Sequence, residues 1–238
     1  MKYHCVAITG ASSGIGREIA LKMGQENLSV GIFARRRDKL EEVAAEIRAI
    51  SPEAKVFSFQ GDVRDKNSIN IFLNEAENFL GEFDIFVNNA GIGFDESFTN
   101  LSPEQVEGML ETNFSGSIWS IYYAMKLFEK RKKGVLVNIS STMVLKASSI
   151  APLYAATKIG VYGLVRALEE KYLTNPDIKV INIIPGPTLT EFSPDRIVKD
   201  DEKNLISPED IAHWLWLAIN SPKSCNVSNL VLRNTGTF

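Results

Sequence analysis

Hydrophobic residues fall into two patterns that alternate along the chain. Short continuous runs are typical of strands buried on both faces of a sheet, and recurrence every three or four positions is typical of helices with one buried face. The runs predict strands at Cys5–Thr9, Leu28–Ala34, Val56–Phe59, Ile85–Val87, Gly134–Ile139, Val180–Ile184 and Leu230–Leu232. The spaced pattern predicts helices at Arg17–Glu26, Arg36–Ile50, Asn67–Leu80, Pro103–Lys132, Tyr154–Leu173 and Pro208–Asn220.

Strands and helices alternate throughout, so the expected fold is α/β, a parallel sheet of about seven strands with helices on both faces. No linker or repeat divides the chain, which favours one domain over residues 1–238. The long helix is expected to bend near Gly116. Residues 141–152 and 186–205 are irregular and follow strands of the second half, so we expect both at the ligand-binding edge of the sheet.

Composition narrows the choice of partner and compartment. The chain has 238 residues, 45% of them hydrophobic, and a net charge of -3, which gives no basis for a nucleic acid or an anionic membrane as partner. Cys5 and Cys225 are the only cysteines, which suits a reducing compartment and predicts neither a disulfide framework nor a zinc site. With two histidines, no signal peptide and no long apolar run, the expectation is a cytoplasmic protein without a metal site.

A glycine-rich turn, Thr9-Gly10-x-x-x-Gly14-Ile15-Gly16, connects the first strand to the first helix. Glycine permits a close approach of backbone to ligand, and a helix N-terminus attracts phosphate. The spacing differs from the usual Gly-x-Gly-x-x-Gly, and a tight connection alone would also explain such a turn. Its position between a strand and a helix favours nucleotide binding.

Tyr154 and Lys158 stand one helical turn apart, so both side chains lie on the same face of the predicted helix. A fixed cation beside a tyrosine lowers its pKa from about 10 toward neutrality, where the phenol becomes a usable acid or base. The alternative is a ring that is merely covered by a lysine stem. Ser141 ends the strand that precedes this helix, so the three side chains are expected to converge on one oxygen.

Together these motifs resemble the short-chain dehydrogenase/reductase family. The glycine turn, Asn88-Asn89-Ala90-Gly91, Ser141, Tyr154-x-x-x-Lys158 and Pro185-Gly186-Pro187-Thr188 occur in the family's order. The resemblance covers essentially the whole chain. It implies a Rossmann-like, doubly wound, three-layer fold, with a cofactor-binding half at about 1–133 and a catalytic half at about 134–238. It also implies a nicotinamide cofactor.

The end of the second strand indicates NADP rather than NAD. Rossmann folds that bind NAD place an acidic residue there, whereas arginine accommodates the 2′-phosphate of NADP. Here Arg35 directly follows the strand and is the favoured phosphate contact, Arg36 and Arg37 continue the run, and Ser12 and Ser13 can add hydroxyl donors. The alternative is that the arginines only open a solvated helix.

The resemblance assigns the remaining cofactor contacts. Asp62 is expected on the adenine amine, although it can instead cap the next turn, and Asn89 is expected on the cofactor while Asn88 is structural. The full expected set is Gly10, Ser12, Ser13, Gly14, Ile15, Gly16, Arg35, Arg36, Asp62, Val63, Asn89, Ala90, Gly91, Tyr154, Lys158, Pro185, Gly186 and Thr188.

The implied reaction is hydride transfer between NADPH and a carbonyl or alcohol, a small-molecule substrate. Tyr154 would exchange the proton, Lys158 would tune Tyr154 and hold the ribose, and Ser141, with Ser140 as an adjacent alternative, would bond the substrate oxygen. Asn113 matches the family asparagine that holds a water. The alternative from another class is a catalytically silent NADP sensor or scaffold.

The substrate itself is not determined by the sequence. The expected pocket is apolar, with Lys146 or Arg196 as possible carboxylate contacts and residues 187–205 as a lid. Apolar residues on the long helix favour a homodimer or homotetramer. The expected pocket residues are Phe94, Met143, Leu153, Leu189 and Phe192.

Overall fold

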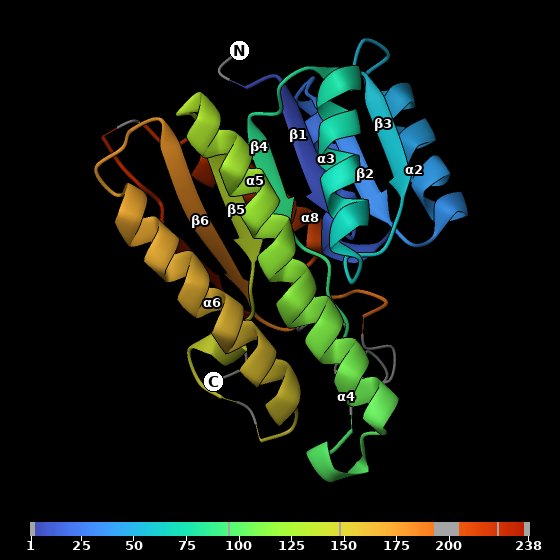
Figure 1. Cartoon of the computed structure of the whole chain (residues 1–238), viewed down its shortest axis with the longest axis vertical. Coiled ribbons are helices and arrows are strands. Elements are labelled where there is room, and N and C mark those ends of the chain that lie inside the picture. The colour runs from blue at the N-terminus through green and yellow to red at the C-terminus, as the bar shows by residue number, and fades with distance from the viewer. Residues whose placement is uncertain (1–2, 95, 148, 193–204, 223, 236–238) are drawn as a thin grey trace.

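A seven-stranded parallel sheet crosses the centre of the molecule in the order β3-β2-β1-β4-β5-β6-β7 (Figure 1). The computed structural model describes residues 3–94, 96–147, 149–192, 205–222 and 224–235. The order reverses direction between β1 and β4, which is the doubly wound arrangement that the alternation of elements predicted. The strands are β1 Cys5–Thr9, β2 Ser29–Ala34, β3 Val56–Gln60, β4 Ile85–Asn88, β5 Gly134–Ile139, β6 Ile178–Pro185 and β7 Asn229–Leu232.

Helices cover both faces of the sheet, with α5 and α6 in front of it and α8 behind it in Figure 1. The principal helices are α1 Gly14–Gln25, α2 Arg37–Ile50, α3 Lys66–Leu80, α4 Pro103–Met109, α5 Ser117–Arg131, α6 Pro152–Tyr172 and α8 Pro208–Ile219. Short 3₁₀ turns occur at Phe98–Asn100 and Thr142–Val144. Among the described residues no helix has both the length and the apolar character needed to cross a membrane.

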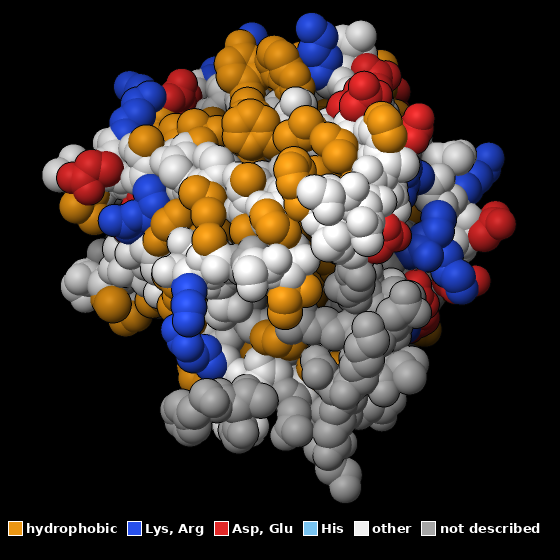
Figure 2. Space-filling view, turned by 90° about the horizontal axis from the view of Figure 1, so that it is seen from below, with side chains coloured by type: hydrophobic (Ala, Val, Ile, Leu, Met, Phe, Trp, Pro, Cys, Tyr) orange, Lys and Arg blue, Asp and Glu red, His pale blue; other side chains and the backbone are white. Residues whose placement is uncertain are grey.

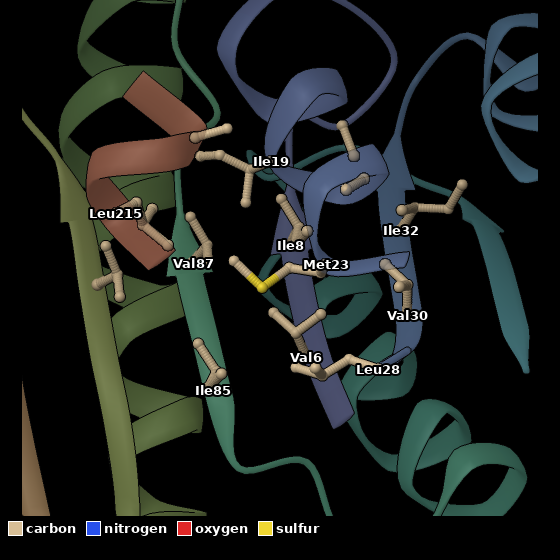
Figure 3. Packing of buried hydrophobic residues seen from close by; sticks show 14 of the residues in the cluster. Val6, Ile8, Ile19, Met23, Leu28, Val30, Ile32, Ile85, Val87 and Leu215 are labelled. Atoms are coloured by element: carbon tan, nitrogen blue, oxygen red, sulfur yellow. The ribbon is translucent and has the colours of Figure 1, made fainter. Parts of the chain in front are cut away.

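Two hydrophobic cores follow from the alternation of side chains along each strand. Val6 and Ile8 of β1 point into the core under α1, α2 and α8, which Figure 3 shows with Met23 and Leu215. Ala7, between them, faces the opposite core under α3, α5 and α6. Each large apolar side chain buried in this way contributes about 1.5–3 kcal/mol, so both faces hold the sheet firmly.

The long helix predicted from Pro103 onward is helical as far as Arg131, but it is not one regular helix. Residues Leu110–Gly116 form a π-helical stretch between α4 and α5. Gly116 lies against the backbone of Val63, where a Cβ would come within 2.9 Å of the carbonyl oxygen. The expected irregularity near Gly116 is therefore a widened turn, a feature that frequently marks functional sites.

Three buried asparagines tie the central strands together below the ligand edge. Asn88 Nδ2 donates to Asn138 Oδ1 at 2.8 Å, and Asn138 Nδ2 donates to Asn182 Oδ1 at 3.1 Å. The three residues are also register partners on β4, β5 and β6. This ladder fixes the relative positions of the strand ends that carry the site, and it makes Asn88 structural, as predicted.

Candidate active site

A cavity of about 660 Å³ opens at the carboxyl ends of the strands, and it is lined by the glycine turn, the residues that follow β2 to β6, and the start of α6. Figure 2 views the molecule from the side toward which the strands point, and hydrophobic side chains gather over much of this face. Seventeen of the eighteen residues expected to bind the cofactor line this cavity; the exception is Gly16.

The glycine turn is held by the residues that follow β4. Asn89 Nδ2 donates to the Thr9 carbonyl at 3.0 Å and to the Gly10 carbonyl at 3.1 Å, and Thr9 Oγ1 accepts from the amides of Asn89 and Ala90. Gly10 has a φ of 68°, and a Cβ there would lie 2.8 Å from the Ala90 Cα. Asn89, which was expected to contact the cofactor, lines the cavity, and its side-chain amide hydrogens hold the turn.

The turn leads directly into α1 and leaves its N-terminus open to the cavity. Ser13 is the N-cap residue, yet its side chain makes no capping hydrogen bond. Gly16 lies behind the turn, where a Cβ would be 2.4 Å from the Gly10 carbonyl oxygen. The first turn of α1 therefore has the close-packed glycine geometry and the positive end that suit a pyrophosphate.

Beside the glycine turn, the guanidinium of Arg36 bridges Ser12 and Ser13. Arg36 Nη2 donates to Ser13 Oγ at 2.6 Å and to Ser12 Oγ at 3.2 Å. Arg35 also lines the cavity, and the side chains of both arginines are exposed. The sequence favoured Arg35 as the surer phosphate ligand, whereas the contacts to both serines are made by Arg36.

Asp62 is engaged with Arg64. Its Oδ1 accepts from the Arg64 amide at 3.0 Å, and its Oδ2 accepts from the guanidinium at 2.6 and 2.9 Å. Partial burial raises the pKa of the Asp62 carboxyl, but these hydrogen bonds and the arginine charges outweigh it and hold the pKa below its ordinary value. Asp62 thus forms the turn cap that was the alternative interpretation, while it and Val63 line the cavity.

Tyr154 and Lys158 face the cavity from the start of α6, which begins at Pro152, two residues before the predicted start. Lys158 Nζ lies 5.7 Å from the centroid of the Tyr154 ring and donates to the Ile139 carbonyl at 3.0 Å. Burial lowers the pKa of the Lys158 ammonium to about 8. The group therefore still carries its charge at neutral pH.

Ser141 lies two residues after the end of β5 and also lines the cavity, so the structure brings the predicted serine, tyrosine and lysine together. The Ser141 hydroxyl accepts a hydrogen bond from the Met143 amide at 3.3 Å. The neighbouring Ser140 is buried in the same wall, and its hydroxyl has no partner among the described residues.

Asn113 lies behind the cavity wall, in the π-helical stretch, and contacts both the loop after β4 and helix α6. Its side chain accepts from the Ile92 amide and donates to the Ile92 carbonyl, both at 2.8 Å. It also approaches Thr157 Oγ1 at 3.4 Å, and Thr157 in turn donates to the Tyr154 carbonyl at 2.8 Å. Asn113 therefore connects the loop after β4 to the turn of α6 that carries Tyr154.

The expected substrate pocket is formed in part. Phe94, Met143 and Phe192 line the cavity, whereas Leu153 and Leu189 do not. Leu189 instead pairs by its amide with the Ile206 carbonyl at 2.9 Å. Arg196 and most of the expected lid, residues 193–204, lie outside the described residues.

Phe192, one of the expected pocket residues, contacts Tyr154 directly. The Phe192 ring packs edge-on against Tyr154 at 5.6 Å and occupies the space beside Gly93. The lining residues that the sequence did not single out include Ile92 and Thr112.

The fold and the site define a class of α/β protein with a nucleotide-type cavity and a tyrosine–lysine pair at its inner end. The amino-acid sequence matches the model of the family described as short chain dehydrogenase over residues 4–200. The chain belongs to this family, which confirms the resemblance drawn from the motifs.

Relatives of known sequence or structure agree with the assignment. An uncharacterized oxidoreductase of Staphylococcus aureus (strain N315) is 29% identical over 226 residues, 95% of each chain. An alcohol dehydrogenase from the archaeon Thermococcus sibiricus, complexed with 5-hydroxy-NADP, is 28% identical, with a TM-score of 0.88 and coverage of 99% of this chain and 98% of that chain. A variant of actinorhodin polyketide ketoreductase with NADPH is 26% identical, with a TM-score of 0.86 and coverage of 98% and 97%.

Proposed function

We propose that the protein is an NADP(H)-dependent oxidoreductase that interconverts a carbonyl compound and an alcohol. The observation that carries the proposal is the buried Lys158 ammonium, held on the Ile139 carbonyl and 5.7 Å from the Tyr154 ring. A cation fixed so close to a phenol favours the phenolate, which allows the phenol to exchange a proton near neutral pH.

The site residues have separate tasks in this proposal. The nicotinamide, when bound, supplies or accepts the hydride. Tyr154 donates the proton to the developing alkoxide in reduction and accepts it in oxidation, and Ser141 hydrogen-bonds the same oxygen. Lys158 keeps Tyr154 acidic and holds the ribose hydroxyls. Asn113 positions the Ile92 loop against α6 through the contacts described above.

The hydrogen-bond donors of the proposed cofactor site suit NADP. Gly10 and Gly16 lack the Cβ that would close the turn, and Arg36 with Ser12 and Ser13 offers hydrogen-bond donors at the position expected for a 2′-phosphate. No carboxylate follows β2 where an NAD enzyme would place one. The complexes of the archaeal alcohol dehydrogenase and of the polyketide ketoreductase with NADP-type cofactors support the same choice.

The substitution Tyr154→Phe tests the proposal because it keeps the ring and removes the acid. Turnover of NADPH with a panel of ketones, aldehydes and diketones should fall by about 10²–10⁴-fold, the contribution typical of general acid catalysis. NADPH binding, followed by fluorescence, should be retained. Tyr162→Phe, on the same helix but outside the cavity lining, is the matched control and should remain active.

Near-normal turnover in Tyr154→Phe would refute the mechanism. A wild-type protein that binds NADPH and reduces no member of the panel would instead identify the silent sensor.

Exposed aromatic residues on α5, Trp119 and Tyr122, support a homodimer or homotetramer, and a monomer by light scattering would refute that assembly.

A further inference from the structure

The carboxylate of Glu191 lies in the cofactor cavity, on the guanidinium proposed to hold the 2′-phosphate. Arg36 Nη1 approaches Glu191 Oε2 at 3.4 Å, while Nη2 and Nε of the same guanidinium contact Ser12 and Ser13. Glu191 follows β6 and is 155 positions away in the chain. An acidic side chain is thus brought to the adenosine end of the cavity from the opposite half of the fold.

Neighbouring residues hold Glu191 in this position. On one side, Thr190 packs over the glycine turn, where a Cβ on Gly14 would meet its methyl group at 3.1 Å. On the other side, Phe192 packs against Tyr154 and fills the space beside Gly93. The preceding residues are anchored to the Ile206 backbone at 2.9 and 3.0 Å. These contacts fix the loop around Glu191, from which its carboxylate reaches Arg36.

A carboxylate and a phosphate bind a guanidinium through the same donors, so they compete for it. Among the described lining residues, the other acidic group is Asp62, which is already paired with Arg64. A dinucleotide that lacks the 2′-phosphate has no need of Arg36 and leaves its pair with Glu191 intact. One that carries the phosphate must break the pair, and it then meets the negative charge of Glu191 nearby.

We infer that Glu191 is a specificity-determining residue for the cofactor, whose carboxylate competes with the 2′-phosphate for Arg36 and weakens the preference for NADP(H) over NAD(H). This inference rests on the proposed function, because it assumes that the phosphate binds at Arg36. It assigns to Glu191 an effect on phosphate recognition alone, and none on the rest of the dinucleotide.

The probes 2′,5′-ADP and 5′-ADP isolate this effect, since they differ only in the 2′-phosphate and lack the nicotinamide. Each is titrated by calorimetry, at low ionic strength, into wild type, Glu191→Gln, Arg36→Met and Glu75→Gln. The side chains of Arg36 and Glu191 are 50% and 72% exposed, so removing their pair should change affinity by about two- to fivefold. Glu75, exposed on α3 and outside the cavity lining, controls for the change in net charge.

Glu191→Gln is expected to bind 2′,5′-ADP two- to fivefold more tightly than wild type and 5′-ADP unchanged, with Glu75→Gln like wild type in both. An unchanged affinity for 2′,5′-ADP, or an equal gain for both probes, overturns the inference. If Arg36→Met nevertheless loses the preference for 2′,5′-ADP, the proposed cofactor site stands without it. If neither wild type nor Glu191→Gln shows such a preference, the inference and the NADP assignment fall together.

Discussion

Replacing Lys158 with methionine should remove a positive charge whose burial destabilises the folded protein. The side chain is buried at the inner end of the cavity, and burial lowers the pKa of its ammonium from 10.5 to about 8. Below pH 8 the folded and unfolded chains both carry the proton, so the cost of the buried charge is constant there. Between pH 8 and 10.5 the folded chain releases the proton first, the unfolded chain binds more protons, and stability rises with pH.

The size of this rise follows from the two pKa values. A difference of about 2.5 between 10.5 and about 8 corresponds to about 3 kcal/mol, at 1.36 kcal/mol for each pKa unit. Methionine has a similar length and no charge, so the free energy of unfolding of Lys158→Met should lack this rise. The same substitution should abolish turnover, because Tyr154 loses its neighbouring cation.

Urea unfolding of the ligand-free protein at a series of pH values from 7 to 10.5 measures the effect. The difference in unfolding free energy between wild type and Lys158→Met cancels the titration of all other groups. It should grow in favour of wild type by about 3 kcal/mol over this range. Lys55→Met, at an exposed position, should run parallel to wild type. A pH-independent difference for Lys158→Met would refute the account of a buried, charge-bearing lysine.

Two further predictions follow from the same geometry. The kcat/KM of carbonyl reduction should fall as pH rises through about 8, the pKa of Lys158 in the free enzyme, because deprotonation removes the cation beside Tyr154; a pH–rate profile flat to pH 9.5 would contradict this. Gly16→Ala should lower stability by about 1–3 kcal/mol and weaken NADPH binding, because its Cβ would lie 2.4 Å from the Gly10 carbonyl oxygen. Gly163→Ala, on α6 with open space around it, is the control and should be neutral or stabilising by urea unfolding.

The sheet was predictable because burial leaves a direct pattern in the sequence. The strands Cys5–Thr9 and Gly134–Ile139 have the bounds that their apolar runs indicated. The π-helical stretch at Leu110–Gly116 was expected only as a bend, because the contact of Gly116 with Val63 depends on tertiary packing. Local pattern gives helix and strand, but it carries no information on such a contact.

The candidate site likewise contains some features that the sequence predicts and others that only the fold shows. Tyr154 and Lys158 could be paired from their spacing, since one helical turn places them together whatever surrounds them. The sequence favoured Arg35 for the phosphate because it directly follows β2, and only the fold shows that Arg36 is the one that reaches Ser12 and Ser13. The pairing of Arg36 with Glu191 could not be predicted, because it joins residues 155 positions apart in two loops.

The central claim is that the protein transfers hydride between NADPH and a carbonyl carbon. The most direct measurement supplies the wild-type protein with NADPH deuterated at C4 of the nicotinamide, in the 4R and 4S forms separately, together with the carbonyl panel. The account predicts an alcohol with one deuterium on its carbinol carbon from one of the two forms, formed about 10²–10⁴-fold more slowly by Tyr154→Phe. An alcohol without deuterium from either form, or bound NADPH with no carbonyl consumed, would contradict it.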